Sequence, residues 1–415
     1  KRILSPAFSI KYVASLEPLI QSCIKLLIKK IDSLSKSSSK TSNLSLNSTS
    51  NQFNENNLQL INLYQLVQFC VLDIIGETAF GGSFNMVEKG SHPLPIKIIE
   101  ELKRRVLNHT FPYFRKFFKK DPWLDEFISK IIKTRIEENS KATKQRIDIL
   151  QILLNNYNPL KQSSPATPVD VTDGKTMSDF EIQDQIMEFL MGGTDTSTFI
   201  IIMAIIMLLK HPEKLRNLRL ELESAFPELQ NHVTSGEHEY EHEYAHEDDL
   251  LLPTHENLKS LKYLNAVIDE TLRLFPITLG GIMRQTTEDT IISNHLIPKD
   301  TIVSASVWKL HRSKQIWDQD ADEFVPERWF DLNPKIRNDA YYPFGSGSRL
   351  CIGNNFALME IRIIISALIG NFDFVPKEGA DLQIVQFITP SLRSKKFEVE
   401  VTRLRESKNY DINNE

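Results

Sequence analysis

Cysteine is scarce in this chain, which has three cysteines in 415 residues: Cys23, Cys70 and Cys351. They show no paired spacing, which argues against a disulfide framework and fits a reducing compartment. An excess of positive charge is also absent, since the formal net charge is −5 at pH 7. The overall charge therefore gives no reason to expect a nucleic-acid partner.

A long uninterrupted apolar segment is missing as well. The best candidate for a membrane span covers residues 186–209, but its continuous apolar run is only residues 199–209. At about 1.5 Å per residue, such a run covers roughly half of a ~30 Å hydrocarbon core. Glu188 and Asp195 would also lie in lipid. We therefore predict a long helix through the middle of a large domain.

Apolar residues make up 41% of the chain, enough for a large core. Their recurrence at spacings of three and four predicts helices over residues 10–31, 58–77, 123–138, 180–209, 258–274 and 356–369. Short segments rich in β-branched residues predict strands over residues 290–297, 301–307 and 396–401. The expected fold class is mainly α with small β-sheets.

Three segments interrupt this pattern. Residues 33–57 are rich in Ser and Asn and are expected to form a low-complexity insertion, residues 157–176 a long loop, and residues 232–249 an acidic loop rich in His and Glu. The motifs that indicate one shared site lie on both sides of these segments. We therefore expect one domain over residues 1–415.

Cys351 belongs to the pattern Phe-x-x-Gly-x-Arg-x-Cys-x-Gly at residues 344–353. It directly precedes a predicted apolar helix, and backbone N–H groups at a helix N-terminus favour a thiolate, the form that ligates metals. Gly347 and Gly353 allow sharp turns and the close approach of a flat cofactor. A buried structural cysteine would explain neither these glycines nor Arg349.

The block Gly-Gly-Thr-Asp-Thr-Ser at residues 192–197 interrupts the central predicted helix. Two adjacent glycines cost about 1 kcal/mol each relative to alanine. Thr and Ser hydroxyls can bond to carbonyls one turn back and distort a helix. The block predicts a locally opened helix, with a kink or close helix packing as the structural alternative.

Glu270 and Arg273 are three residues apart on one face of the helix predicted over residues 258–274. By themselves they could be a surface ion pair. Arg328 follows in the sequence Pro-Glu-Arg. Two guanidinium groups can satisfy one buried carboxylate, so the alternative is a buried structural network.

The order of these four motifs resembles the cytochrome P450 superfamily of haem-thiolate monooxygenases, of the eukaryotic microsomal type. The resemblance runs from residue 1 to about residue 403 and implies a chain whose N-terminal part is missing. It implies haem b held between the central long helix and the helix after the Cys351 loop, with Cys351 as the axial iron ligand. The cofactor-binding residues it implies are Cys351, Arg349, Phe344, Gly347, Gly353, Arg284 and Lys1.

The resemblance also implies roles at the other motifs. Thr196 would hydrogen-bond dioxygen or its water, and Asp195 would relay protons. Glu270, Arg273 and Arg328 would form a structural triad that supports the Cys351 loop. Residues implied for the substrate pocket are Gly192, Thr278, Leu279, Met283 and Ile388.

The implied reaction inserts one oxygen atom of O₂ into a lipophilic substrate. Electrons would come from NADPH through NADPH–cytochrome P450 reductase, with cytochrome b5 as a second donor. Residues 316–329 look most like fungal and plant chains that hydroxylate fatty acids, so a fatty-acid-like substrate is favoured, with sterols and secondary metabolites open. The implied location is the cytosolic face of the endoplasmic reticulum membrane, and the aromatic and basic residues 111–120 are expected at the lipid surface.

Three alternatives stay open. The first is a haem-thiolate isomerase or dehydratase acting on peroxides, against which Thr196 argues. The second is an inactive or binding-only relative. The third is a zinc hydrolase, because two overlapping His-Glu-x-x-His matches occur at residues 238–246, although these come from one short acidic repeat.

Overall fold

The structure is a computed structural model that describes residues 4–42, 60–111, 113, 119–141, 148–157, 177–227, 251–279, 281, 283–387 and 389–404, with only the backbone described for residues 37–42. Helices account for most of these residues, which confirms the predicted mainly helical class. Of the predicted insertion and loops at residues 33–57, 157–176 and 232–249, the parts 43–57, 158–176 and 232–249 lie outside the described residues. Residues 33–42 continue helix α2, so the prediction of an insertion is wrong there.

The described helices range from four residues in α4, α13 and α14 to 32 residues in α8. The α-helices are α1 (Ile10–Ser15), α2 (Glu17–Ser42), α3 (Leu63–Ala79), α4 (Met86–Lys89), α5 (Leu94–Thr110), α6 (Pro122–Lys141), α7 (Ile149–Asn155), α8 (Asp179–Lys210), α9 (Pro212–Ala225), α11 (His255–Lys259), α12 (Lys262–Leu274), α13 (Val307–Leu310), α14 (Lys314–Trp317), α15 (Pro334–Ala340) and α16 (Asn354–Asn371). The short 3₁₀ turns are η1 (Ser5–Phe8), η4 (Pro326–Trp329) and η5 (Gly347–Arg349).

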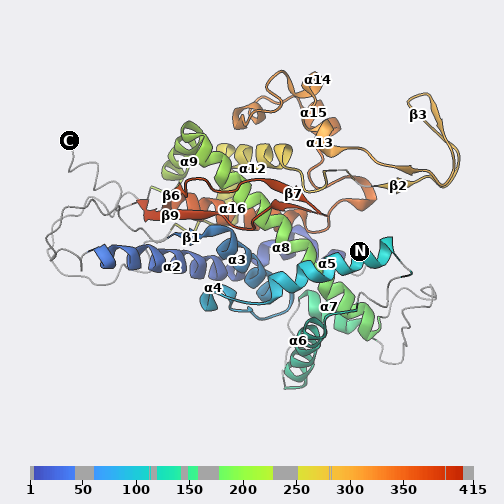
Figure 1. Ribbon diagram of the computed structural model, residues 1–415, viewed down its shortest axis with the longest axis horizontal. Coiled ribbons are helices and arrows are strands. Elements are labelled where there is room, and N and C mark those ends of the chain that lie inside the picture. Colours follow the sequence, from blue (N-terminus) through green and yellow to red (C-terminus); the bar gives the residue numbers. More distant parts are fainter. Residues whose placement is uncertain are drawn as a thin grey trace.

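The described strands form small antiparallel sheets. The largest has the order β1 (Ile61–Asn62), β9 (Glu398–Arg403) and β6 (Phe372–Pro376). Three further pairs are β2 (Arg284–Gln285) with β5 (Ile302–Val303), β3 (Thr290–Ile292) with β4 (His295–Ile297), and β7 (Ile384–Gln386) with β8 (Pro390–Leu392). The β3–β4 pair extends away from the helical body (Figure 1).

The central helix is α8, which has 32 residues and begins at a reciprocal capping box between Ser178 and Glu181. It crosses the middle of the molecule (Figure 1) and contacts α3, α12 and α16 among others. Among the described helices it alone is long and apolar enough to cross a membrane. However, 72% of its most apolar window is buried inside the fold. The side chains of its neighbours provide that apolar environment.

Several predicted boundaries are wrong for local reasons. The helix predicted over residues 10–31 is divided at Leu16, where Pro18 occupies the first turn of α2, and α2 then continues to Ser42. The helix predicted over residues 258–274 is likewise divided into α11 and α12. The third boundary error concerns residues 58–77, where α3 begins only at Leu63. Residues 61 and 62 belong to β1, and the Asn62 side chain caps the helix.

The strand predicted over residues 290–297 is a hairpin. Ser293 and Asn294 have φ values of 49° and 64°, and this pair of left-handed residues makes the tight turn between β3 and β4. The strand predicted over residues 301–307 is shorter, because the Ser306 side chain caps α13 at Lys309. In both segments, polar residues set where the strand ends: Ser293 and Asn294 form the turn, and Ser306 begins a helix.

Candidate active site

The loop before α16 holds Cys351. Its backbone N–H donates to the Phe344 carbonyl (3.0 Å), and the Leu350 N–H donates to the Gly347 carbonyl (3.1 Å). Gly345 and Gly347 have φ values of 75° and 63°, so the turn needs glycine at both positions. The result is a compact loop that brings the cysteine to the N-terminal end of a long apolar helix.

Cys351 is exposed and takes part in no disulfide among the described residues. The surface beside it is open too: Leu350 is exposed, and a Cβ added to Gly347 would meet no atom within 4 Å. A Cβ at Gly353 would first meet the Phe8 ring at 3.9 Å. An accessible thiol with open space beside it, at the edge of the main core, fits a bulky planar group ligated through sulfur.

The block at residues 192–197 lies inside α8, which continues through it as helix; the predicted break is therefore wrong. The distortion takes a milder form. The Thr194 hydroxyl donates to the Leu190 carbonyl (2.5 Å) and the Thr196 hydroxyl to the Gly192 carbonyl (2.8 Å). Each hydroxyl forms its hydrogen bond to a carbonyl one turn earlier in the same helix. The helix therefore does not open at this block. Gly192 is exposed, and Thr196 is partly exposed beside it.

Asp195 is 7% exposed, and both of its carboxylate oxygens have partners. Oδ1 accepts from the Gln68 amide (3.0 Å) in α3, and Oδ2 pairs with the Lys395 ammonium (3.2 Å) beyond β8. These partners are 127 and 200 residues away in the sequence, so no local pattern could have indicated them. A buried carboxylate next to Thr196 is thus held between an amide and the ammonium of a partly exposed lysine.

Ser197, the last residue of the block, connects α8 to α16, the helix that follows the Cys351 loop. Its hydroxyl donates to Oε1 of Glu360 in α16, while Oε2 of Glu360 has no partner among the described residues. Burial raises the Glu360 pKa to about 8, so this carboxyl is protonated at neutral pH. Sequence reasoning did not find Glu360, whose carboxyl lies within a mainly apolar helix.

Glu270 and Arg273 are fully buried, which rules out the surface ion pair. Arg273 binds the Glu270 carboxylate in a bidentate manner, with Nε and Nη2 each 2.8 Å from an oxygen. Arg328 adds a bond from Nε to Oε1 (2.9 Å). The Trp329 indole N–H and the Val325 backbone N–H, both at 2.9 Å, complete the shell. The structure therefore brings the three predicted triad residues together around one carboxylate.

His311 extends this network toward the cysteine loop. Its Nδ1 lies 3.1 Å from the Arg273 carbonyl, and its Nε2 accepts from the Tyr342 backbone N–H (2.9 Å), two residues before Phe344. Burial lowers the His311 pKa to about 4, so the ring is neutral, with the proton on Nδ1. Sequence reasoning missed this histidine, because a single His after a short helix has no distinguishing signal.

The other predicted site residues are less well placed. Lys1 and Ile388 lie outside the described residues. Arg284 is exposed, and its guanidinium donates to the neighbouring Met283 carbonyl (3.0 Å). Met283 is itself 69% exposed, and Thr278 is exposed at the end of the segment after α12. Leu279 is partly buried, and its carbonyl accepts from the Trp308 N–H (3.2 Å).

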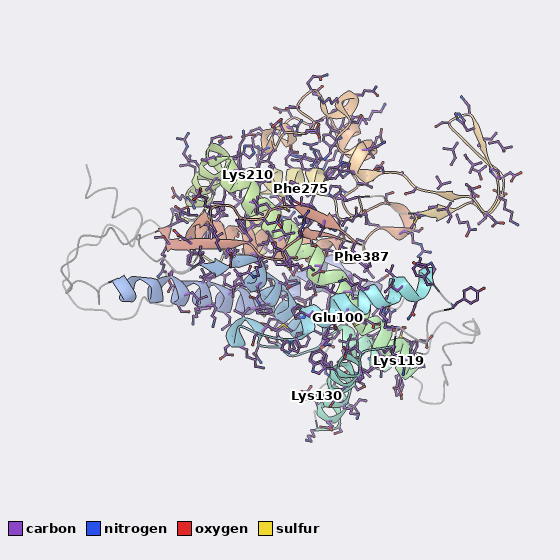
Figure 2. All side chains as sticks on the ribbon, viewed as in Figure 1. Glu100, Lys119, Lys130, Lys210, Phe275 and Phe387 are labelled. Carbon is purple, nitrogen blue, oxygen red and sulfur yellow. The ribbon has the colours of Figure 1, made fainter. Side chains whose placement is uncertain are left out.

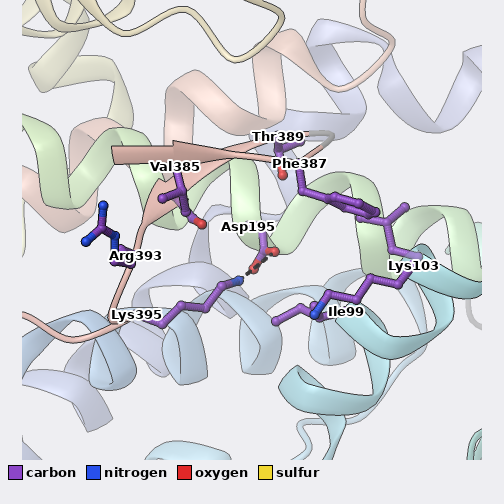
Figure 3. Close-up of a pocket in the computed structure, with 10 residues that line it drawn as sticks. Ile99, Lys103, Asp195, Val385, Phe387, Thr389, Arg393 and Lys395 are labelled. Carbon is purple, nitrogen blue, oxygen red and sulfur yellow. Dashed lines mark hydrogen bonds and ion pairs between the residues drawn. The ribbon is translucent and has the colours of Figure 1, made fainter. Parts of the chain in front are cut away.

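A cavity of about 250 Å³ lies on the Asp195 side of α8, between α5 and the β7–β8 hairpin (Figure 3). Its apolar lining includes Ile99, Leu102, Val385 and Phe387. Its charged lining consists of Lys103, Asp195, Arg393 and Lys395. Figure 3 shows the ion pair between Lys395 and Asp195 within this cavity.

Comparison with known proteins identifies the class. The profile of the cytochrome P450 family matches residues 1–401. The cytochrome P450 monooxygenase FUS8 of Gibberella moniliformis is 30% identical over 411 residues, which cover 97% of this chain and 70% of that protein. The bifunctional cytochrome P450/NADPH–P450 reductase 2 of Bacillus subtilis is 30% identical over 329 residues, 77% of this chain and 28% of that protein.

The fold agrees with this result. The crystal structure of the cytochrome P450DA heme domain superimposes with a TM-score of 0.71 at 22% identity, covering 97% of this chain and 76% of that one. The chain therefore belongs to the cytochrome P450 family, and its class is that of the monooxygenases, which are oxidoreductases. The family match argues against the zinc-hydrolase alternative, whose His-Glu motifs lie outside the described residues.

Proposed function

We propose that this protein is a haem-thiolate monooxygenase that binds haem b through Cys351. The observation that carries the proposal is an accessible thiol on a glycine-turned loop that leads into α16. Phe344, Gly347, Arg349 and Gly353 would complete the cofactor-binding loop. Arg284 and Lys1 are proposed as further cations for the haem propionates. When bound, haem supplies activation of dioxygen, and the thiolate favours O–O cleavage.

The chain itself supplies proton handling on the opposite face. Thr196 presents a hydroxyl whose donor bond now goes to the Gly192 carbonyl, which leaves the oxygen lone pairs available to accept. Asp195, one residue earlier, is held between Gln68 and Lys395. We assign Thr196 as the hydroxyl that would turn from the Gly192 carbonyl to hydrogen-bond dioxygen or its water, and Asp195 as the group that would help relay protons to it.

The triad of Glu270, Arg273 and Arg328 is proposed as a structural support. Its carboxylate bonds to Arg273, and Arg273 donates to the carbonyls of His311 (2.7 Å) and Ala321 (2.6 Å). Through His311 and Tyr342 the network reaches the segment that enters the cysteine loop. It therefore holds the loop backbone in place without contact with substrate.

The proposed substrate is lipophilic and fatty-acid-like, and Gly192, Thr278, Leu279, Met283 and Ile388 are its proposed contacts. Electrons would come from NADPH through a cytochrome P450 reductase, with cytochrome b5 as a second donor; the Bacillus subtilis relative is named as a fusion with such a reductase. The proposed location is the cytosolic face of the endoplasmic reticulum membrane, and the proposed organisation is one haem-binding domain over residues 1–415.

The reaction is tested with purified protein, reductase, NADPH, a fatty acid and isotopically labelled dioxygen. Mass spectrometry is expected to show product that has gained one labelled oxygen atom, and no product without NADPH. Turnover of a fatty hydroperoxide without NADPH and without label would instead establish the isomerase or dehydratase reaction. Absence of both reactions in haem-loaded protein would identify an inactive relative.

A further inference from the structure

The buried carboxylate of Asp195 depends on one cation. A carboxylate that is only 7% exposed requires hydrogen bonds and a compensating charge. The Gln68 amide, 3.0 Å from Oδ1, supplies a hydrogen bond but carries no charge. Among the described residues, the Lys395 ammonium alone forms an ion pair with Asp195, at 3.2 Å from Oδ2. Lys395 is therefore the residue that offsets the charge of this carboxylate.

The backbone of Lys395 has a conformation that is unfavourable for lysine. Its φ value of 49° lies in the left-handed region, where glycine avoids the steric cost of a side chain. The turn is closed by a hydrogen bond from the Lys395 N–H to the Leu392 carbonyl (3.1 Å). The Ser394 hydroxyl accepts a further bond from the Lys396 N–H (3.2 Å). A lysine held in a strained turn indicates that its side chain has a function that offsets the strain.

The side chain of Lys395 reaches from the surface to the middle of α8. Its side chain is 31% exposed, whereas that of Asp195 is 10% exposed. The turn follows β8, which contacts α8, and the ion pair lies in the cavity between them (Figure 3). Thr196 is the next residue of α8. The ion pair thus ties the turn after β8 to the part of α8 that carries the Thr196 hydroxyl.

We propose that Lys395 is a positioning residue for the oxygenation: its ammonium holds the Asp195 carboxylate in the place from which it relays protons to Thr196. Lys395 acts through Asp195 rather than by contact with substrate or haem. The proposal rests on the function proposed above, in which Asp195 belongs to the proton relay. The pairing of Lys395 with Asp195 is measurable without turnover, so the pairing and the reaction are tested separately.

The pairing is tested by urea unfolding of the haem-loaded protein and of K395M, D195N and the double variant. K395M is expected to lower the unfolding midpoint, because it leaves the Asp195 carboxylate buried without a cation. In the D195N background, which keeps an oxygen for the Gln68 amide, K395M is expected to have little further effect. K396M is the matched control, since it replaces an exposed lysine of the same turn, and its midpoint is expected to be unchanged. Equal losses from K395M in both backgrounds would overturn the pairing.

The role in oxygenation is tested by the ratio of product to NADPH consumed. K395M is expected to lower this ratio at least about tenfold, a part of the about 10²–10⁴-fold that general acid–base groups contribute. K395R is expected to restore most of it, because a guanidinium group also pairs with a carboxylate. The double variant K395M/D195N is expected to lose no more than D195N alone, because Lys395 acts through Asp195.

Two results would overturn the role of Lys395. One is an unchanged ratio in K395M, and the other is a loss in K395M/D195N equal to the product of the two separate losses. Absence of labelled product from the unaltered, haem-loaded protein would instead overturn the proposed reaction, and the unfolding midpoints would still decide the pairing of Lys395 with Asp195.

Discussion

At the scale of single residues, burial sets the protonation of two side chains near the candidate site. Glu360 is protonated at neutral pH because burial raises its pKa to about 8, and it accepts a hydrogen bond from Ser197. His311 is neutral because burial lowers its pKa to about 4. These two groups connect α8 to α16 and α12 to the cysteine loop, and their opposite pKa shifts predict opposite pH effects.

Replacement of Thr196 should separate reduction from oxygenation. T196A removes the hydroxyl proposed to hydrogen-bond dioxygen or its water, and general-acid groups typically contribute about 10²–10⁴-fold in rate. We expect product formation to fall toward that range while NADPH consumption continues, and T196S to restore much of the coupling. The ratio of product to NADPH consumed measures this. An unchanged ratio in T196A would exclude the proposed role.

Glu360 should make the protein less stable as pH rises. Its pKa is higher in the folded protein (about 8) than in the unfolded chain, so the folded protein binds the extra proton between about pH 4.5 and 8. Stability is therefore lost over this window as pH increases, by up to about 1.4 kcal/mol per pH unit. Urea unfolding at several pH values is expected to show a shallower loss in E360Q. An identical pH slope in E360Q and the unaltered protein would contradict the assignment.

His311 should act in the opposite direction. Its pKa is depressed to about 4 from an ordinary value of 6.5, so the unfolded chain binds the extra proton between these values. Stability is present above pH 6.5 and is lost as pH falls toward 4. In H311Q, which keeps a polar side chain without this titration, unfolding curves are expected to vary less over that range. Steeper acid loss in H311Q would refute this account.

At the scale of secondary-structure elements, the segment between α12 and the cysteine loop is organised around one buried carboxylate. Glu270 receives bonds from Arg273, Arg328, Trp329 and the Val325 backbone. Arg273 also lies over the Trp317 ring at 5.1 Å. A segment with only short helices is thereby fixed by polar bonds, next to a small apolar cluster that contains Trp317 and Trp329. Phe275, at the end of α12, is labelled in Figure 2.

Removal of Arg273 should prevent haem incorporation. R273M leaves Glu270 buried with one guanidinium fewer, and loss of one partner of a buried pair typically costs about 3–5 kcal/mol. We expect apoprotein or aggregate on expression, measured as haem content per polypeptide. R337Q is the control. Arg337 is half exposed, and its pair with Asp269 is expected to contribute less than about 1 kcal/mol. Normal haem content in R273M would rule out the structural role.

Elements formed by interactions between residues close in sequence were predicted well, and contacts between distant residues were not. The apolar pattern of α8 and α16 is local and strong, and both helices were predicted to within a few residues. The β3–β4 turn and the division at Leu16 depend on single residues. A hydrophobic pattern averaged over many residues does not detect them. The order of the four motifs predicted the triad and the cysteine loop. It could not predict Gln68, Lys395, Glu360 or His311, because their contacts are made only in the folded chain.

At the scale of the whole molecule, the core around α8 joins the two halves of the site. α8 contacts α3 on one side and α16 on another, and the Ser197–Glu360 bond lies at the second contact. The cysteine loop precedes α16, and the Glu270 network supports its other end. The thiol and the Thr196 block are thus positioned by one continuous core, so changes far from Cys351 should alter the environment of the haem.

The most direct test of the central claim is the absorption spectrum of the reduced, carbon monoxide-treated protein, with and without the change C351S. The account predicts the red-shifted Soret band typical of thiolate-ligated haem in the unaltered protein, and loss of that band and of oxygenase turnover in C351S. If C351S kept both the band and the turnover, Cys351 would not be the iron ligand.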